Sequence, residues 1–227
     1  MIGIFDSGVG GLTALKEVRS LLPMADITYL ADRKNAPYGT KSEDQILSYT
    51  ENNIHRLRSL GASKILIACC TASTLYPQLS QEDKKISVPI ILPAATAATT
   101  TTKNGRVAVI ATRATVRSKA FTRSVSSLGK FHVAEFDAQP LVAMVESGAS
   151  DEKALTVEEH STLERILAPI KSFGADTLIL GCTHFPHIKE HIASLLPSVK
   201  LINPSLEGAL KIASTITTEE HGTTVYL

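Results

Sequence analysis

The sequence lacks an excess of charge and a long apolar run. Its 227 residues carry 23 basic and 22 acidic side chains, for a formal net charge of +1. Nothing in this balance favours nucleic acid or an anionic membrane surface as a partner. No apolar run approaches the ~18 residues that a membrane-spanning helix needs. The start, Met-Ile-Gly-Ile-Phe-Asp, has no charged region ahead of a long apolar one, so we expect a first strand there and not a signal peptide.

Cysteine is scarce as well. Cys69 and Cys70 are adjacent and Cys182 lies far along the chain, which makes a poor disulfide framework. We therefore expect a cytoplasmic protein, whose thiols serve reactivity, metal binding or packing. With 44% hydrophobic residues, the chain has ample material for a packed core.

Short β-branched runs alternate with stretches that carry apolar residues at helical spacing. Near-continuous apolar strands such as ILIA and LILG are typical of sheets covered by helices on both faces, so parallel α/β sheets are predicted. The predicted strands are residues 2–5, 27–31, 65–68, 88–92, 107–111, 132–136, 178–181 and 199–202, and the predicted helices are residues 12–22, 43–60, 116–128, 157–173 and 206–217.

The two halves of the chain resemble each other. IGIFDSG near the start is similar to VAVIATRAT at 107–115, and ILIACCT at 65–71 is similar to LILGCTH at 178–184. A boundary near Pro93 fits this repeat. The Ala/Thr-rich residues 94–102 that follow are either a linker or a helix that begins the second half, and the sequence leaves open where the last helix packs. Ligands of open α/β sheets bind at the carboxyl ends of the strands. If the halves face each other, one cleft collects the groups at these ends: Asp6, Ser7, Asp32, Cys69, Cys70, Thr71, Thr112, Cys182, Thr183, His184 and Asn203.

Cys69 and Cys182 stand at the same place relative to a strand, in opposite halves. A cysteine between a strand and a helix meets the positive end of the helix dipole, which lowers its pKa. Two such thiols suit the removal of a proton from one face of a stereocentre and its return to the other, because base and acid exchange roles with direction. The free thiol pKa near ~8.5 needs only modest tuning, for which Asp6 and His184 are candidates.

Other interpretations stay open. Cys69 and Cys182 are alternatively small buried hydrophobes, and Cys70 fits a structural role at least as well as a chemical one. A zinc site that adds His184 to the cysteines is disfavoured, because adjacent cysteines chelate poorly compared with C-x₂₋₄-C spacing. Residues 187–191 match the H-x-x-E-H string of some metalloproteases, but histidines at the head of a helix more often form a solvated face.

Two polar loops are candidates for holding a carboxylate. DSGVGG at 6–11 has glycines that let backbone N–H groups approach an anion at a helix N-terminus, with a simple tight turn as the alternative. It matches no nucleotide-binding string. PYGTK at 37–41 offers backbone and hydroxyl donors.

Four strings occur in an order that resembles the glutamate racemase family, within the cofactor-independent aspartate/glutamate racemase superfamily: IGIFDSGVGGLTAL, APYGTKS, IACCTAS and DTLILGCTHFP. The resemblance implies two pseudo-symmetric, flavodoxin-like α/β domains whose parallel sheets face a central cleft. We expect residues 1–93 and 206–227 in the first domain and residues 94–205 in the second. It also implies a homodimer that interconverts L- and D-glutamate for peptidoglycan synthesis, without cofactor or metal.

The resemblance also assigns roles to residues. It implies that Cys69 and Cys182 are the catalytic thiols, one taking the Cα proton while the other donates to the opposite face. Asp6 and His184 match groups that assist the thiols and contact the substrate amine. The positions that match amino-acid-binding residues are Ser7, Tyr38, Gly39, Thr71 and Thr183, and further matches in the cleft are Thr115 and Glu146.

The chain departs from the family at two positions. Cys70 stands where the family has an asparagine, so a weakly hydrogen-bonding thiol replaces an amide expected to bind substrate. Asn35 stands where an arginine is frequent. The alternatives are a racemase for aspartate or another small acid, which DSGVGG disfavours, and a member that binds an amino acid or a protein without turnover. Cys70 favours the second, and retention of both Cys69 and Cys182 opposes it.

Overall fold

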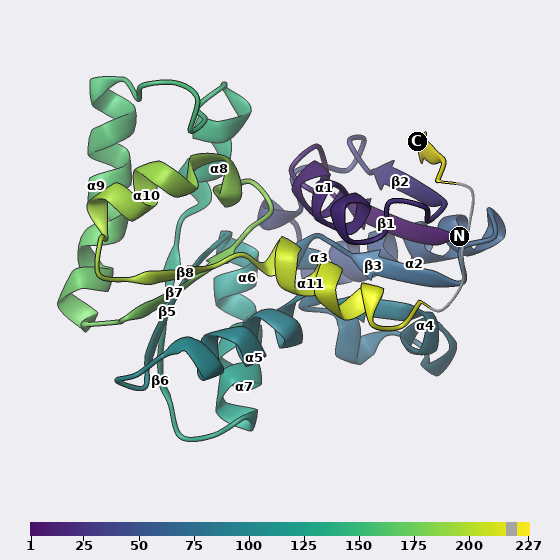
Figure 1. Cartoon of the computed structure of the whole chain (residues 1–227), viewed down its shortest axis with the longest axis horizontal. Helices are drawn as coiled ribbons and strands as arrows, with labels where there is room; N and C mark the ends of the chain where they lie inside the picture. The colour runs from purple at the N-terminus through teal and green to yellow at the C-terminus, as the bar shows by residue number, and fades with distance from the viewer. Residues whose placement is uncertain (217–221) are drawn as a thin grey trace.

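The structure is a computed structural model that describes residues 1–216 and 222–227. Its strands form two parallel sheets (Figure 1). The first sheet contains β1 (Ile2–Asp6), β2 (Ile27–Ala31), β3 (Lys64–Ile67), β4 (Ser87–Pro89) and β9 (Thr224–Tyr226), and the second contains β5 (Arg106–Ala111), β6 (His132–Asp137), β7 (Thr177–Gly181) and β8 (Lys200–Ile202).

The two sheets share one strand order. The first runs β4-β3-β1-β2-β9 and the second runs β8-β7-β5-β6, so β1 corresponds to β5 and β3 to β7. This is the order of a flavodoxin-like sheet. In each sheet the two corresponding strands are neighbours, with Phe5 opposite Ile67 and Ala111 opposite Gly181. The predicted α/β fold with an internal repeat is confirmed, and it brings the chemically active strand ends together in pairs.

Helices cover both faces of each sheet. They are α1 (Leu12–Leu21), α2 (Glu43–Ser59), α3 (Cys70–Ser73), α4 (Gln81–Ile86), α5 (Ile91–Thr101), α6 (Arg113–Ser118), α7 (Ala120–Ser127), α8 (Gln139–Glu146), α9 (Val157–Phe173), α10 (Lys189–Leu195) and α11 (Pro204–Ala213), with 3₁₀ turns η1 (Tyr38–Thr40), η2 (Tyr76–Gln78) and η3 (Phe185–Ile188).

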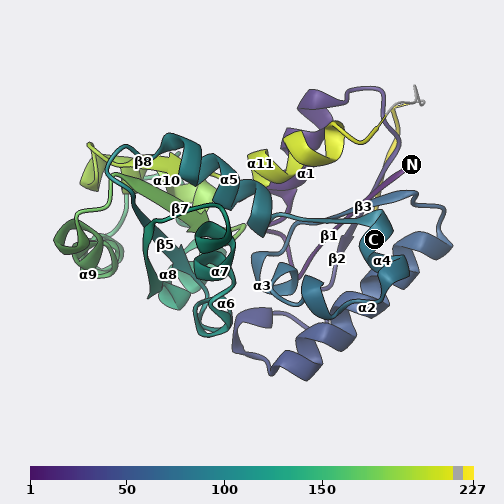
Figure 2. The same ribbon diagram turned by 90° about the horizontal axis from the view of Figure 1, so that it is seen from below.

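One hydrophobic core runs through both halves. It joins Ile4 and Leu66 of the first sheet to Val109 and Ile179 of the second. The helices α1, α5, α7 and α11 contribute to it, and α11 packs against both α1 and α5 (Figures 1 and 2). Two further cores lie on the outer faces, one under α2 and one under α8, α9 and α10. The halves are therefore held together by burial of apolar surface as well as by the connecting chain.

Several predicted boundaries were wrong. The strand predicted at 88–92 ends at Pro89, because Ile91 already begins α5. The helix predicted at 116–128 is two helices, since Lys119 adopts a left-handed backbone conformation (φ +53°) that interrupts the α-helical path. The last helix ends at Ala213, and its predicted final residue, Thr217, lies outside the described residues.

The missed elements are short: α3, α4, α8, α10 and β9 each have eight residues or fewer, too few for a clear period. Within residues 1–216 and 222–227, no helix is long and apolar enough to cross a bilayer.

The approach of α11 to the first sheet depends on Gly208. A Cβ at this position would lie 2.4 Å from Ile90 Cγ2 and 3.1 Å from Leu66 Cδ1. Replacing Gly208 with valine should lower the free energy of unfolding by about 1–3 kcal/mol through overpacking, measured by urea denaturation. Leu210→Ala, at a half-exposed position of the same helix, should change it by no more than about 0.5 kcal/mol. Equal stability of Gly208→Val and the unmodified protein would contradict this description of the packing.

Candidate active site

The first candidate thiol, Cys69, follows β3 after one intervening residue, Ala68. It is the N-cap of α3, and its sulfur accepts a hydrogen bond from Ala72 N at 3.5 Å. The thiol donates to Ser7 Oγ at 3.6 Å, and Ser7 follows the neighbouring strand β1. Cys69 is buried, with 5% of its surface exposed. The pairing of β1 with β3 thus fixes this thiol beside the loop after β1.

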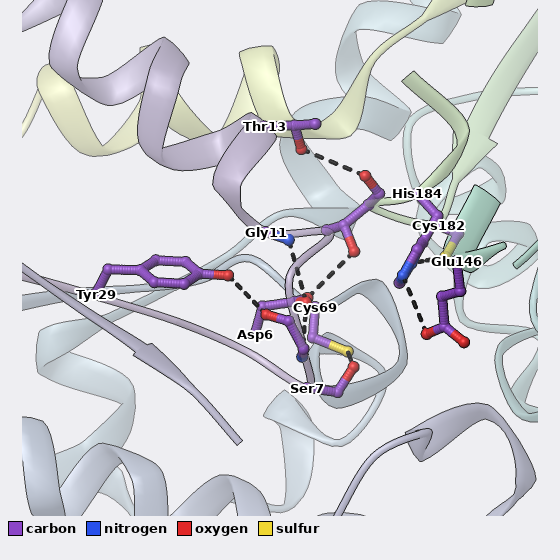
Figure 3. A network of polar contacts seen from close by, with 11 residues as sticks. Asp6, Ser7, Gly11, Thr13, Tyr29, Cys69, Glu146, Cys182 and His184 are labelled. Carbon is purple, nitrogen blue, oxygen red and sulfur yellow. Dashed lines mark hydrogen bonds and ion pairs between the residues drawn. The ribbon is translucent and has the colours of Figure 1, made fainter. Parts of the chain in front are cut away.

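The second candidate thiol, Cys182, occupies the corresponding place after β7. Its sulfur lies 3.6 Å from His184 Nδ1. On the far side of the ring, His184 Nε2 lies 3.4 Å from Glu146 Oε1 of α8, an approach without hydrogen-bond geometry (Figure 3). The imidazole is buried and the carboxylate is half-exposed. A line of groups that can carry protons therefore runs from Cys182 toward solvent.

Both thiols line one small cavity between the halves. Its volume is about 30 Å³, room for roughly one water molecule. The residues predicted for the site line it, except for Asp6, Asp32, Thr115 and Asn203. The full lining is Ser7, Gly8, Ala36, Pro37, Tyr38, Gly39, Cys69, Cys70, Thr71, Thr112, Gln139, Val142, Glu146, Cys182, Thr183 and His184. Gln139 and Val142 were not predicted, because no recognised string or clear periodicity marks the short helix α8.

Asp6 lies behind the cavity wall and connects the halves. It is fully buried. Its Oδ2 accepts hydrogen bonds from Gly8 N at 3.0 Å and Gly11 N at 3.1 Å, and its Oδ1 accepts one from Thr183 Oγ1 at 3.2 Å. The DSGVGG loop was expected to offer its N–H groups to a substrate carboxylate. Two of them instead bind the chain's own Asp6 carboxylate.

Burial raises the pKa of both thiols, contrary to the lowered values expected from the helix dipole. The pKa of Cys69 is raised to about 12, mainly by burial and then by the Asp6 charge, against a hydrogen bond from Ala72 N. The pKa of Cys182 is also raised, again chiefly by burial. The helix after Cys69 has only four residues, so its dipole is short. Both thiols are protonated near neutral pH.

Cys70, the residue in the place of the family asparagine, is 2% exposed and lines the same cavity. It also packs in the core that joins the two halves. Burial raises its pKa most, followed by the charges of Cys182 and Cys69. Cys70 therefore has both a packing role and access to the cavity.

Threonine hydroxyls form a closed set across the interface. Thr71 Oγ1 lies 2.9 Å from Thr112 Oγ1 and 3.1 Å from Thr115 Oγ1, and the last two are 2.9 Å apart. Thr71 belongs to α3 of the first half, whereas Thr112 and Thr115 lie at the start of α6 in the second. All three are buried, so this cluster ties the halves together beside Cys70.

The Tyr38 hydroxyl is engaged by hydrogen bonds within the protein. It donates to Asp32 Oδ2 and accepts a hydrogen bond from Asn53 Nδ2 at 3.0 Å. Asn35, in the place of the frequent arginine, donates to both Asp32 oxygens at 3.0 Å. The turn that contains Tyr38 and Gly39 thus presents its backbone to the cavity, supported from behind by Asp32.

The metal alternatives gain no geometric support. Among the described residues, no group of three or more histidine, cysteine or acidic side chains is placed to hold an ion. In the H-x-x-E-H string, His191 Nε2 lies 3.1 Å from Ser150 O and 3.0 Å from Lys153 O. His191 therefore braces the loop after α8.

Two parallel sheets of one strand order, each presenting a thiol to a shared cavity, define an α/β protein with a candidate site between its two halves. The model of the Asp/Glu/Hydantoin racemase family matches residues 15–210. The chain belongs to this family, and the family resemblance predicted from the four strings is confirmed.

Relatives named glutamate racemase match nearly the whole chain. The one from Persephonella marina is 41% identical over 212 residues, which cover 92% of this chain and 80% of the relative. A crystal structure of a glutamate racemase isoform from Bacillus anthracis has 28% identity and a TM-score of 0.91, covering 100% of this chain and 86% of that one. Glutamate racemase from Francisella tularensis in complex with D-glutamate has 32% identity and a TM-score of 0.89, covering 99% and 86%.

Because the pKa of each thiol is raised, its alkylation by iodoacetamide should require a higher pH than the alkylation of an ordinary thiol. Because only the thiolate reacts, the rate at Cys69 and Cys182 should still rise above about pH 9, whereas an ordinary thiol is half-ionised near pH ~8.5. Peptide mass mapping after timed quenching measures each cysteine separately. The pH dependence is the readout, since burial alone slows the reaction without moving its midpoint. A midpoint at or below about pH 8.5 at Cys69 would refute the raised pKa.

The close contact of Gly10 with Thr183 and His184 can be tested by adding a methyl group at Gly10. A Cβ at Gly10 would lie 2.6 Å from Thr183 Oγ1 and 2.8 Å from His184 Nδ1, whereas one at Gly8 would meet nothing within 4 Å. Gly10→Ala should displace the loop that carries Cys182 and lower kcat/KM by up to about 100-fold, in an assay of racemisation. Gly8→Ala should cost less, and the opposite order would argue against this contact.

Proposed function

We propose that this protein interconverts L- and D-glutamate by a two-thiol mechanism without a cofactor, supplying D-glutamate for peptidoglycan. The observation that carries the proposal is the placement of Cys69 and Cys182. Each follows the corresponding strand of its own sheet, and both line one cavity of about 30 Å³. The identity of the substrate, glutamate, is taken from the racemase relatives, which match about nine-tenths of the chain.

The chemistry follows from two thiols on either side of a Cα atom. In one direction the thiolate of one cysteine takes the Cα proton, and the thiol of the other delivers its proton to the opposite face. The reverse reaction exchanges the roles. A thiol of raised pKa gives a thiolate that is a stronger base, which suits the weakly acidic Cα–H bond.

Supporting groups are proposed around this pair. His184, 3.6 Å from Cys182, exchanges protons with that thiol, and Glu146 orients the ring. Asp6 holds Thr183 and the loop after β1 in place. The groups proposed to bind the amino acid are Ser7, Tyr38, Gly39, Cys70, Thr71 and Thr183.

The cavity must widen to admit substrate. Its volume of about 30 Å³ is far below the about 300 Å³ at the lower end of typical ligand pockets. We propose that the halves separate, with residues 1–93 and 206–227 in one domain and residues 94–205 in the other. The pairing of β9 with β2 supports the first assignment.

We further propose a cytoplasmic location and a homodimer. A cytoplasmic location is consistent with three free, buried cysteines. A homodimer rests on the family resemblance alone, and light scattering of the purified protein would test it.

The proposal is tested by incubating the protein with L-glutamate under reducing conditions and following D-glutamate by chiral chromatography. Cys69→Ser and Cys182→Ser should each lower the rate at least about 100-fold, because each removes the acid/base group for one face. Cys70→Asn removes a thiol from the same cavity and should keep or increase turnover, so it is the matched control.

Three results would contradict the proposal. Racemisation of aspartate in preference to glutamate would indicate a different substrate. Binding of glutamate without turnover would indicate a member that has lost activity. A serine variant of Cys69 or Cys182 that keeps the unmodified rate would exclude the two-thiol mechanism.

A further inference from the structure

The cavity contains few uncommitted hydrogen-bond donors for an anionic substrate. No lysine or arginine is among the lining residues that the structure describes. The hydroxyls of Thr71 and Thr112 bond to each other and to Thr115. Thr183 donates to Asp6 and Tyr38 donates to Asp32. Most hydroxyls that line the cavity are therefore already used within the protein.

Gln139 is an exception. It is the first residue of α8, and its backbone N–H donates to Asp137 Oδ1 at 2.9 Å, which fixes the start of the helix. Its side-chain Oε1 accepts a long hydrogen bond of 3.4 Å from Arg113 N. Among the described residues, the Nε2 group has no partner, although the side chain is partly buried and lines the cavity. An amide with two unused N–H groups thus stands at the cavity wall.

The position of this amide points to a carboxylate. A Cβ on Gly39 would lie 2.4 Å from Gln139 Oε1, so the oxygen of the amide reaches from the second half to the backbone of the 37–41 turn, and Nε2, bonded to the same carbon, stands next to it. That turn was predicted to hold a substrate carboxylate. Cys70, on the first half, lacks the amide expected there. A neutral N–H donor beside the turn is the group that an anion needs where no cation is present.

We propose that Gln139 is a specificity-determining residue whose Nε2–H group donates to a carboxylate of the substrate, in compensation for the amide absent at Cys70. The assignment rests on the proposed function in that it takes glutamate as the ligand.

The test compares Gln139→Met, which keeps the length but removes the amide, with Gln139→Glu, which adds negative charge. Glutamate binding is measured by calorimetry, and KM and kcat by chiral chromatography. Loss of a hydrogen bond to a charged group should raise Kd and KM about tenfold or more in Gln139→Met, with kcat changed less than about threefold, because uniform binding is lost. Gln139→Glu should raise them further by repulsion.

A double variant distinguishes the loss of a substrate contact from a structural defect at α8. Adding Cys70→Asn to Gln139→Met should recover part of the lost affinity, which a merely structural defect at α8 would not allow. A lower KM in Gln139→Glu would show that Gln139 faces the substrate ammonium, and would overturn the proposal.

The outcomes also separate this proposal from the racemase assignment. Racemisation by the unmodified protein together with an unchanged KM and Kd in Gln139→Met would overturn the role of Gln139 alone. Weaker glutamate binding in Gln139→Met, in a protein that does not racemise, would uphold Gln139 and refute the racemase. A protein that neither binds nor racemises glutamate would refute both.

Discussion

The buried carboxylate of Asp6 is the interaction on which the geometry of the site depends. It receives two backbone N–H groups from the loop after β1 and one hydroxyl from Thr183, which follows Cys182. A fully buried carboxylate is costly unless its oxygens are satisfied, so the loop and the second half are held against it. Gly10 then lies against Thr183 and His184. One side chain of the first half thereby positions the thiol of the second.

The same burial sets the acid/base character of the thiols. Taking Cys69 and Cys182 out of water raises the pKa of each, and the Asp6 charge adds to the effect. The resting site therefore favours two neutral thiols and a strong base once one of them ionises. In the proposed mechanism, His184 and Glu146, which lie between Cys182 and solvent, are the route by which a proton leaves.

The sequence predicts the parts of this site that depend on strand ends. Cys69 and Cys182 were found because parallel strands of one order bring their carboxyl ends to the same edge, and a repeat in the sequence marks both strands. Gln139 was not predicted, because it begins an eight-residue helix whose sequence matches no recognised string. The direction of the thiol pKa shifts was wrong because it depends on burial between two halves, which no local pattern records. The contact of Thr71 with Thr112 and Thr115 joins residues more than 40 positions apart, so no local pattern predicts it either.

The measurement that tests the central claim most directly is the early course of racemisation of L-glutamate in D₂O, with the deuterium content of both enantiomers followed by mass spectrometry. If Cys69 and Cys182 act from opposite faces, each D-glutamate formed carries solvent deuterium at Cα, while the remaining L-glutamate stays protiated. Deuterium that enters the L-glutamate pool as fast as D-glutamate is formed, or protium retained in the product, would contradict a base and an acid on opposite sides of the cavity.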